Sequence, residues 1–560
     1  VCQWRSYQGY ISASRSSMVL DGSELPLAAQ VSDEEDLKLE SDIAALRATQ
    51  KRRACVVLRV ICILMLIGIL FCRLVERSRH GSPPNPKAWE EAFFFVMLIV
   101  QLTINLTFTV PMICVFSKRR IQALIQAIRS HMVWQEVATH DADLEDMELA
   151  EVGPGSTEIT AIVPCYLPNE EAIIEKTILY ILEHLEAPGE LILHVVYNTP
   201  NDMPEIEERL RRMSKLPDLP RGRTLNVTRV PSSKSKAENL NYALGLISSP
   251  YVAIYDADHH PKADSLIMMY ERLMRDKLDC VQGSTYIRNL EQGGFLGRFV
   301  DAEFFYTYFM AQPSARFLTH LAYFGGSNAL WDRQALETLG FRENMQTEDI
   351  DVSFRAIVAQ RRIDLCPEAQ SGELAPASFC AFFRQRLRWT VGWDQVSVDL
   401  FGTFLDGKAG LRKNAGIFYY LYMRWFNIFA GFSTGVLLPI LQLTGHSHHI
   451  YHGAFHFATS HIQWLLLVLL VSSALCMICE GIIQAHHKTW RWGQIPVLVL
   501  FVVGGSLYAS YQLCMTSVSL CKIARGNIEG WYVSPRRQDD KTERSPRAAS
   551  LMPGVDSPSD

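Results

Sequence analysis

Hydrophobic residues gather in long stretches near both ends of the chain, whereas the middle alternates short apolar runs with polar segments. Residues 1–50 are polar, include an acidic run and predict a disordered cytosolic tail. An apolar stretch starts at residue 54, and a second covers about residues 92–116. Each is long enough to cross a bilayer as a helix, so we expect two transmembrane helices within residues 51–116.

The C-terminal third of the chain is apolar again. Residues 415–444 are mainly apolar around Arg424, which divides them into an interfacial lead-in and a membrane span. Two more spans are predicted at about 463–485 and 494–522. We therefore expect the C-terminal transmembrane helices to occupy residues 425–522.

Residues 117–376 contain no apolar run of span length and predict a separate α/β domain. Short runs rich in β-branched residues alternate there with helical patterns, which is typical of a mostly parallel sheet. The predicted strands are EITAIVPCY (158–166), ELILHVVYN (190–198), TLNVTRV (224–230), YVAIYDAD (251–258) and CVQGSTYIRN (280–289). Ligands of such sheets bind at the carboxyl ends of the strands.

Two aromatic-rich segments with scattered charges, 293–317 and 378–406, suit amphipathic helices lying at the membrane interface, although helices of the core would show the same pattern. We assign residues 377–424 to these interface helices. Basic residues at 51–53 and 118–120 flank the first two spans and place the α/β domain in the cytosol.

Composition adds two limits on function. The formal net charge is −5, so no nucleic acid or other polyanion is indicated as a partner. Most of the 13 cysteines fall in strongly apolar stretches, which favours buried thiols over a disulfide framework.

The stretch Tyr255–His260 (YDADHH) follows an apolar run and is the first candidate for chemistry. Asp256 and Asp258 are two residues apart on an extended segment, so both carboxylates point to the same side. Carboxylates suit a hard cation such as Mg²⁺ or Mn²⁺, which bridges nucleotide phosphates. Zinc binding through His259 and His260, or an ordinary polar turn, are the alternatives.

Two further motifs lie downstream. Thr347-Glu348-Asp349 precedes a helical pattern, where acidic residues are expected from helix capping alone but could also provide a general base. On a helix, Gln385, Arg388 and Trp389 share one face, which offers an amide, a guanidinium and a flat aromatic ring. A basic helix whose side chains reach the membrane surface would explain the same spacing.

Together, and in this order between membrane spans, the motifs Asp-x-Asp, Thr-Glu-Asp and Gln-x-x-Arg-Trp resemble those of the membrane-embedded processive family 2 glycosyltransferases. This family includes cellulose, curdlan, chitin and hyaluronan synthases. The resemblance covers roughly residues 55–537. It implies a glycosyltransferase domain of the GT-A type, with a mixed and mostly parallel sheet, inserted between transmembrane helices.

The resemblance also implies a role for each matched residue. Those expected to bind the UDP-sugar donor are Pro164, Tyr166, Glu170, Asn198, Lys236, Asp256, Asp258, Gln385, Arg388 and Trp389. Those expected to bind the acceptor are Phe324, Gly325, Gly326, Ser327 and Trp389. Asp349 is the expected catalytic base, with Thr347 and Glu348 beside it, and the metal, Mg²⁺ or Mn²⁺, is assigned to Asp256 and Asp258. In residues 523–560, a gating motif would comprise Trp531, Val533, Ser534 and Arg536, followed by a disordered tail.

Two features depart from the family pattern. The second predicted strand ends in Tyr197 and Asn198, where the family has an aspartate that contacts the base. In addition, two spans before the α/β domain and three after it would put the gating motif on the wrong side of the membrane. The sequence leaves open whether residues 415–444 form a single span.

The expected activity is inverting, processive transfer of a sugar, glucose first, from a UDP-sugar to a growing β-glycan that crosses the plasma membrane, or second the Golgi membrane. N-acetylglucosamine polymerisation and non-processive transfer to a lipid or short acceptor are the alternatives. A transporter with a regulatory domain would leave the acidic motifs unexplained, and a metal-dependent hydrolase lacks a zinc ligand set. Partners beyond the donor, the polysaccharide and the bilayer, such as accessory subunits or further copies of the chain, stay open.

Overall fold

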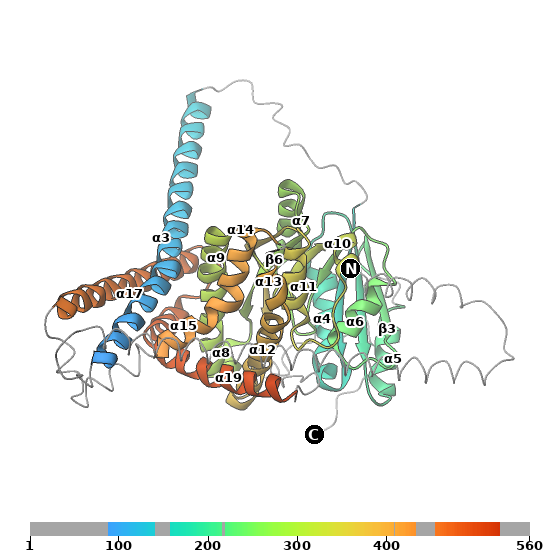
Figure 1. Ribbon diagram of the computed structural model, residues 1–560. Coiled ribbons are helices and arrows are strands. Elements are labelled where there is room, and N and C mark those ends of the chain that lie inside the picture. Colours follow the sequence, from blue (N-terminus) through green and yellow to red (C-terminus); the bar gives the residue numbers. More distant parts are fainter. Residues whose placement is uncertain (1–87, 140–156, 216–218, 408, 433–453, 527–560) are drawn as a thin grey trace.

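The computed structural model describes residues 88–139, 157–215, 219–407, 409–432 and 454–526 (Figure 1). An eight-stranded sheet lies on one side of the molecule, and a group of helices lies on the other. The strands are β1 (Glu158–Tyr166), β2 (Glu190–Asn198), β3 (Arg223–Arg229), β4 (Tyr251–Ile254), β5 (His260–Pro261), β6 (Cys280–Ile287), β7 (Ala329–Asp332) and β8 (Ile363–Glu373).

The sheet has the order β3-β2-β1-β4-β7-β6-β8-β5. Strands β3, β2, β1 and β4 run parallel to one another, β7 is antiparallel to both neighbours, and β6 and β8 are again parallel. The predicted mixed, mostly parallel sheet is confirmed, and each of the five predicted strands has a counterpart. Strand β4 ends at Ile254, however, so Asp256 and Asp258 lie in the turn after it and not on an extended strand. Strand β8 was not predicted, because IDLCPEAQSGE contains proline, glycine and acidic residues that are depleted in strands.

Helices cover both faces of the sheet. One buried core joins the sheet to α4 (Leu167–His184), α5 (Pro204–Met213) and α7 (Ser265–Asp276). A second core, on the opposite face, joins it to α6 (Lys236–Leu244), α10 (Arg333–Leu339) and α11 (Glu348–Val358). The strands between these layers are buried on both sides, which explains their nearly continuous apolar sequences.

The two aromatic-rich segments are helical, as predicted. The first forms α8 (Leu290–Phe305), the π-helix η1 (Tyr306–Ala311) and α9 (Gln312–Thr319), and the second forms α12 (Phe379–Asp399) and α13 (Phe401–Leu405). Both pack against the C-terminal helices, with Phe305 stacked on Trp490 at 4.2 Å between ring centroids. Their position relative to a membrane stays a prediction.

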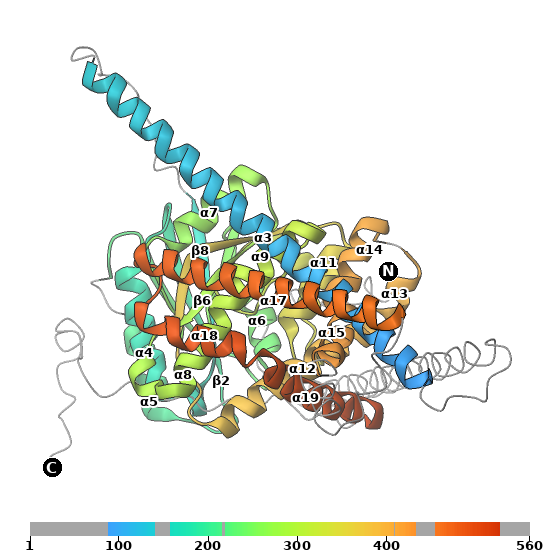
Figure 2. The same ribbon diagram turned by 90° about the vertical axis from the view of Figure 1, so that its left-hand side faces the viewer.

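The remaining helices form the other side of the molecule (Figures 1 and 2). They are α3 (Ala88–Thr139), α14 (Leu411–Ile417), the π-helix η2 (Phe418–Tyr422), α15 (Met423–Phe432), α17 (Ala454–His486), the short η4 (Trp492–Gln494), α18 (Ile495–Val503) and α19 (Gly505–Arg525). Helix α3 packs against α17 and continues to Thr139, beyond residue 116, where the second span was expected to end.

Within the described residues, Trp464–His486 in α17 is the one unbroken helix long and apolar enough to cross a membrane, with a mean hydropathy of 2.5. It coincides with the span predicted at 463–485. The predicted span at 494–522 is a bent pair, Trp492–Val503 and Leu507–Arg525, whose axes differ by 65°. The span predicted within 51–87 and most of the one starting at residue 425 lie outside the described residues.

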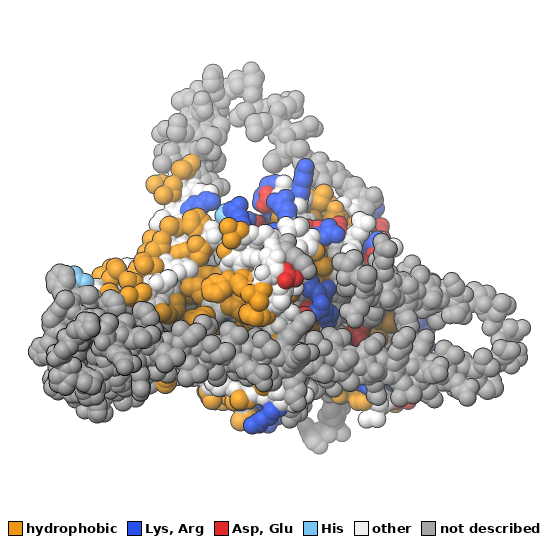
Figure 3. All heavy atoms as spheres, in the orientation of Figure 1, with side chains coloured by type: hydrophobic (Ala, Val, Ile, Leu, Met, Phe, Trp, Pro, Cys, Tyr) orange, Lys and Arg blue, Asp and Glu red, His pale blue; other side chains and the backbone are white. Residues whose placement is uncertain are grey.

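The bend between α18 and α19 has a local cause. Gly504 and Gly505 stand at the junction, and two glycines in a row weaken a helix. Helix α19 then turns a face that carries tyrosine, threonine and serine toward α12, where Thr516 and Ser519 are buried. Figure 3 shows apolar side chains gathered over the helical side of the molecule, whereas charged side chains lie toward the sheet.

Candidate active site

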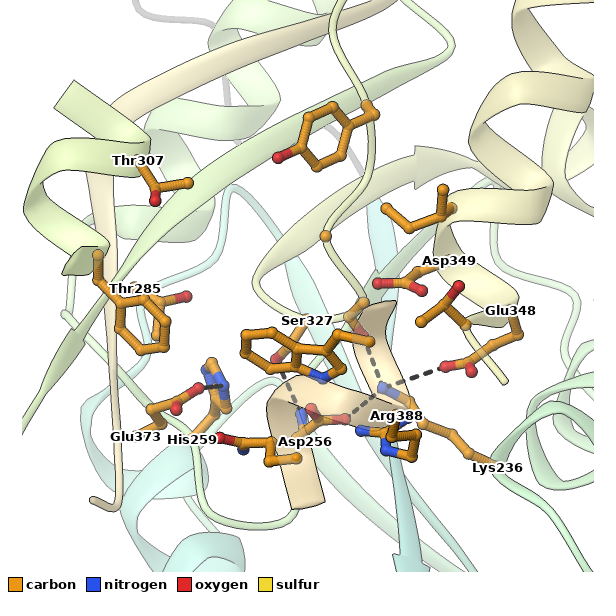
Figure 4. A pocket seen from close by; sticks show the side chains of 18 of the residues that line it. Lys236, Asp256, His259, Thr285, Thr307, Ser327, Glu348, Asp349, Glu373 and Arg388 are labelled. Atoms are coloured by element: carbon orange, nitrogen blue, oxygen red, sulfur yellow. Dashed lines mark hydrogen bonds and ion pairs between the residues drawn. The ribbon is translucent and has the colours of Figure 1, made fainter. Parts of the chain in front are cut away.

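A cavity of about 280 Å³ opens at the carboxyl ends of β1 and β4, bounded by the start of α11 and the middle of α12 (Figure 4). The predicted site residues that line it are Pro164, Glu170, Lys236, Asp256, Gly325, Gly326, Ser327, Thr347, Glu348, Asp349, Gln385, Arg388 and Trp389. All three motifs therefore meet at one place, although 93 residues separate Asp256 from Asp349 in the sequence (349 − 256 = 93).

An ion-pair network links the first two motifs. Lys236, at the start of α6, lies 2.5 Å from a carboxylate oxygen of Asp256 and 3.5 Å from one of Glu348. Its ammonium also donates to the backbone carbonyl of Gly326 at 2.8 Å. Burial alone would lower the pKa of Lys236, but the two carboxylates outweigh burial and raise it. The site therefore holds a fixed positive charge beside Asp256.

Asp349 lies in the first turn of α11 and faces the cavity (Figure 4). Burial, followed by repulsion from Glu348, raises its pKa to about 7, while Lys236 opposes the shift. Gly326 has a φ of +92°, and a Cβ there would lie 2.8 Å from the Asp349 carboxylate, so only glycine fits this close approach. A carboxyl group with a pKa near neutrality is suited to accept a proton.

The third motif is fixed by the packing of α12 on α11. The Ser378 hydroxyl caps α12 by accepting from the backbone N–H of Ala381 at 3.2 Å. A Cβ at Gly392 would overlap the Thr347 hydroxyl, so this glycine lets the two helices approach closely. Arg388 donates to the backbone carbonyl of Gln346 at 3.0 Å. The packing thus brings the Gln-x-x-Arg-Trp face to the cavity.

Four predicted site residues do not line the cavity: Tyr166, Asn198, Asp258 and Phe324. Phe324 is fully buried beneath its neighbours in the core. Asn198 donates to the Ser233 carbonyl at 3.0 Å and accepts from Asn239 at 2.8 Å, both within the fold. The gating residues 531–536 lie outside the described residues.

Of the two aspartates assigned to the metal ion, only one has its carboxylate in the cavity. Asp256 presents its carboxylate to the cavity, whereas Asp258 is fully buried and accepts from the Leu374 backbone N–H at 3.1 Å. Among the described residues there is no cluster of three His, Cys, Asp or Glu side chains that could hold a metal ion. Hard cations take phosphate oxygens and water as their other ligands, so the Asp256 carboxylate suits such an ion beside a diphosphate, whereas the Asp258 carboxylate does not face that position.

The two histidines of YDADHH have different places in the structure. His260 stacks on Tyr180 at 4.1 Å, and burial lowers its pKa to about 2, so it is a neutral core residue. His259 lines the cavity, where its ring nitrogens lie 3.0 Å from the Ser371 hydroxyl and 3.3 Å from Glu373. His259 is therefore part of the cavity wall, whereas His260 is part of the core.

Sequence reasoning missed half of the cavity lining. The additional residues are Cys165, Asn239, His259, Thr285, Glu303, Phe304, Thr307, Tyr308, Gln312, Tyr323, Ile350, Glu373 and Trp393. Glu373 ends β8, so the rule that places ligands at strand ends would have identified it had β8 been predicted. Glu303, Phe304, Thr307 and Tyr308 belong to the aromatic-rich segment that was interpreted only as an interface helix.

Comparisons with known proteins find similarity to glycosyltransferases. The model of the glycosyl transferase family group 2 matches residues 251–510, and that of glycosyl transferase family 2 matches residues 160–340. A probable glycosyltransferase, YdaM, of Bacillus subtilis strain 168 is 25% identical over 279 residues, which are 49% of this chain and 64% of that protein.

Two other curated relatives have more specific names. The β-monoglucosyldiacylglycerol synthase of Trichormus variabilis is 26% identical over 44% of this chain and 51% of its own length. The poly-β-1,6-N-acetyl-D-glucosamine synthase of Staphylococcus epidermidis is 25% identical over 45% of this chain and 59% of its own length. The chain thus spans between about half and two thirds of the length of these relatives.

Among solved structures, a Pyrobaculum calidifontis mannosyltransferase in complex with GDP-Man and Mn²⁺ has a TM-score of 0.39 and 19% identity, covering 65% of this chain and 98% of that one. Glucosyl-3-phosphoglycerate synthase of Mycobacterium tuberculosis, in complex with Mn²⁺ and UDP-glucose, has a TM-score of 0.30 and 16% identity, covering 46% of this chain and 81% of that one. Between them the two family models match residues 160–510, so this part of the chain is that of a family 2 glycosyltransferase, an enzyme that depends on a nucleotide sugar.

Proposed function

We propose that this protein is an inverting polysaccharide synthase, which transfers a sugar from a UDP-sugar to a growing β-glycan and passes the product across a membrane. The observation that carries the proposal is the meeting of Asp256, Asp349 and the Gln385–Trp389 face in one cavity. The sugar proposed first is glucose. N-acetylglucosamine is second, and the name of the staphylococcal relative supports it.

Two basic side chains would stabilise the leaving group. When the bond between the anomeric carbon and the diphosphate oxygen breaks, the electron pair stays on the diphosphate. Lys236 and Arg388 line the same cavity and place positive charge where that negative charge develops. A bound Mg²⁺ or Mn²⁺ would add charge there, and Asp256 and Asp258 are the residues proposed to hold it.

Asp349 would act on the acceptor. As an acceptor hydroxyl forms its bond to the anomeric carbon from the opposite face, its proton passes to the Asp349 carboxylate. Trp389 offers a flat ring on which a terminal sugar can stack, and the Gly325–Ser327 segment lies next to Asp349 in the cavity. Attack opposite the leaving group inverts an α-linked donor to a β-linked product.

A membrane location rests on the C-terminal helices. The helix Trp464–His486 is apolar over its length, and only 22% of its most apolar stretch is buried inside the molecule. Its exposed side chains include Trp464, Leu467 and Val471. A bilayer around α17 would cover this surface, which supports the proposal that the cavity lies beside a membrane and opens toward the cytosol.

A second candidate function is non-processive transfer to a lipid acceptor. The name of the Trichormus relative, which is a glucosyldiacylglycerol synthase, favours it. Both functions would use the same donor and the same base, so they differ in the product. A polymer would support processive synthesis, and a single sugar on a lipid would support the second candidate.

The test combines product analysis with one variant. The full-length protein in detergent is incubated with Mn²⁺ and a panel of radiolabelled UDP-sugars, and the product is sized and digested with linkage-specific glycanases. Asp349→Asn is expected to abolish transfer, because its amide cannot accept the proton, while UDP affinity changes by less than about twofold. Turnover near that of the wild type in Asp349→Asn would exclude Asp349 as the base.

A further inference from the structure

Arg386 lies within the third motif but is not one of the residues that line the cavity. Its side chain is 5% exposed, and its guanidinium donates to the Glu303 carboxylate on α8 at 2.7 Å. A second nitrogen of the guanidinium donates to the side-chain oxygen of Gln385 at 3.1 Å. The guanidinium carbon lies 4.0 Å from the centroid of the Trp389 ring. One buried cation therefore contacts three residues of the cavity wall.

Other helices hold this cation in place. The Tyr508 hydroxyl on α19 donates to the second oxygen of Glu303 at 2.5 Å. The rings of Phe382 and Phe304 lie 4.8 and 5.7 Å from the guanidinium carbon. Helices α8, α12 and α19 thus meet at the Glu303–Arg386 pair, although residues 303 and 508 are far apart in the sequence.

We propose that Arg386, held by Glu303, is a positioning residue that sets the plane of the Trp389 ring and the direction of the Gln385 amide. This inference rests on the proposed function, in which Trp389 holds the terminal acceptor sugar. A guanidinium can hydrogen-bond in its plane and stack on an aromatic ring with its face at the same time, which a lysine ammonium cannot do. The arrangement therefore depends on arginine and not only on positive charge.

The consequence concerns the acceptor more than the donor. If Trp389 tilts, an acceptor hydroxyl is no longer held beside Asp349, and water can take its place. The donor phosphates, by contrast, are proposed to contact Lys236 and Arg388, which do not depend on Arg386. A defect at Arg386 should thus lower transfer to an acceptor more than it weakens donor binding.

The test uses Arg386→Lys in the full-length protein, compared with Arg384→Lys as a matched control, because Arg384 is exposed on the same helix and does not line the cavity. Three quantities are measured: the affinity for UDP, the melting temperature and a transfer ratio. The transfer ratio is the amount of label transferred to glycan or lipid, divided by the amount of label released as free sugar. It is measured with membranes and with octyl β-D-glucoside as acceptors. We expect the ratio to fall by about tenfold in Arg386→Lys, as for loss of a desolvated cation–aromatic contact. UDP affinity should change by less than about twofold.

Glu303→Gln provides a second variant that keeps the shape of the side chain but removes its charge and one of its two acceptor oxygens. Glu303→Gln should also lower the ratio of transferred label to released label. If Arg386→Lys does not fold, the proposal is tested with Glu303→Gln alone. Unchanged ratios in both variants, or an equal loss of donor and acceptor use, would overturn the inference and leave a structural ion pair. A wild-type protein that neither hydrolyses nor transfers any UDP-sugar would instead contradict the proposed function.

Discussion

At the residue scale, Asp349 couples the chemistry to pH. Its pKa is raised to about 7 by burial and then by Glu348, so the carboxyl group is protonated and inactive as a base at lower pH. We expect kcat/KM for the donor to rise with pH up to about 7 and then to level off, because this parameter reports the free enzyme. Rate measurements from pH 5 to pH 9 would show the midpoint.

The variant Glu348→Gln tests the cause of the raised Asp349 pKa, because it should move the midpoint of the pH profile in a known direction. Removing the neighbouring negative charge should lower the pKa of Asp349, so the midpoint of the profile should move to lower pH. The raised pKa of Asp349 also links stability to pH. As pH rises toward 7, the unfolded chain has already lost the proton of this carboxyl group, whereas the folded protein still holds it. The free energy of unfolding therefore falls as pH rises over this range. A flat profile, or a midpoint that moves upward in Glu348→Gln, would contradict this account of Asp349.

Residue identity alone predicted much of the site, but it could not tell which side chains face the cavity. Asp256, Asp349 and Trp389 belong to motifs with characteristic spacing, and the structure brings them together. Asn198 was inferred from its position at a strand end, yet its amide is occupied by Asn239 and Ser233. Whether such a side chain faces the cavity depends on its contacts with segments that are distant in the sequence. These contacts cannot be inferred from a single sequence.

At the element scale, the close approach of α11 and α12 can be tested at Gly392. A methyl group there would overlap Thr347, so Gly392→Ala should push α12 away from the start of α11 and destabilise the fold by about 1–3 kcal/mol. Both the melting temperature and transfer should fall, since α12 carries Arg388 and Trp389. Thermal unfolding and a transfer assay would measure the two effects.

Gly402→Ala is the matched control for Gly392→Ala. Gly402 lies in α13, and no atom lies within 4 Å of the position a methyl group would take. Alanine also favours helix more than glycine does, so this variant should be neutral or slightly stabilising. Equal destabilisation in both variants would show that a general effect of the substitution, and not the contact with Thr347, accounts for the loss.

The elements themselves were predicted unevenly, for a physical reason. Strands β1, β2 and β6 are buried runs of apolar and β-branched residues, and this pattern can be recognised directly in the sequence. The bend between α18 and α19 is different, because a stretch of span length and apolar composition predicts a straight helix. The bend falls at Gly504 and Gly505, and beyond it the Tyr508 hydroxyl of α19 donates to Glu303 on α8.

At the scale of the whole molecule, the path of α19 bears on the gating motif. Helix α19 lies along α12 (Figures 1 and 2), and Ile523 in its last turn is buried against Val391 and Val398. Gly526 ends the helix in a left-handed conformation. The chain therefore leaves α19 beside the helix that carries Arg388 and Trp389.

The proposed gating motif begins five positions after Gly526, and each extended residue spans at most about 3.6 Å, so the chain length keeps the motif within reach of α12. We predict that a chain ending at Gly526 loses about tenfold or more in kcat/KM for the donor, because a loop that closes over the nucleotide excludes water and completes the site. A chain ending at Arg537 keeps Trp531 and Arg536 and should retain the activity of the full chain. Steady-state rates and melting temperatures of both truncations would test this, and equal activity in the shorter chain would show that residues 527–537 do not act as a gate.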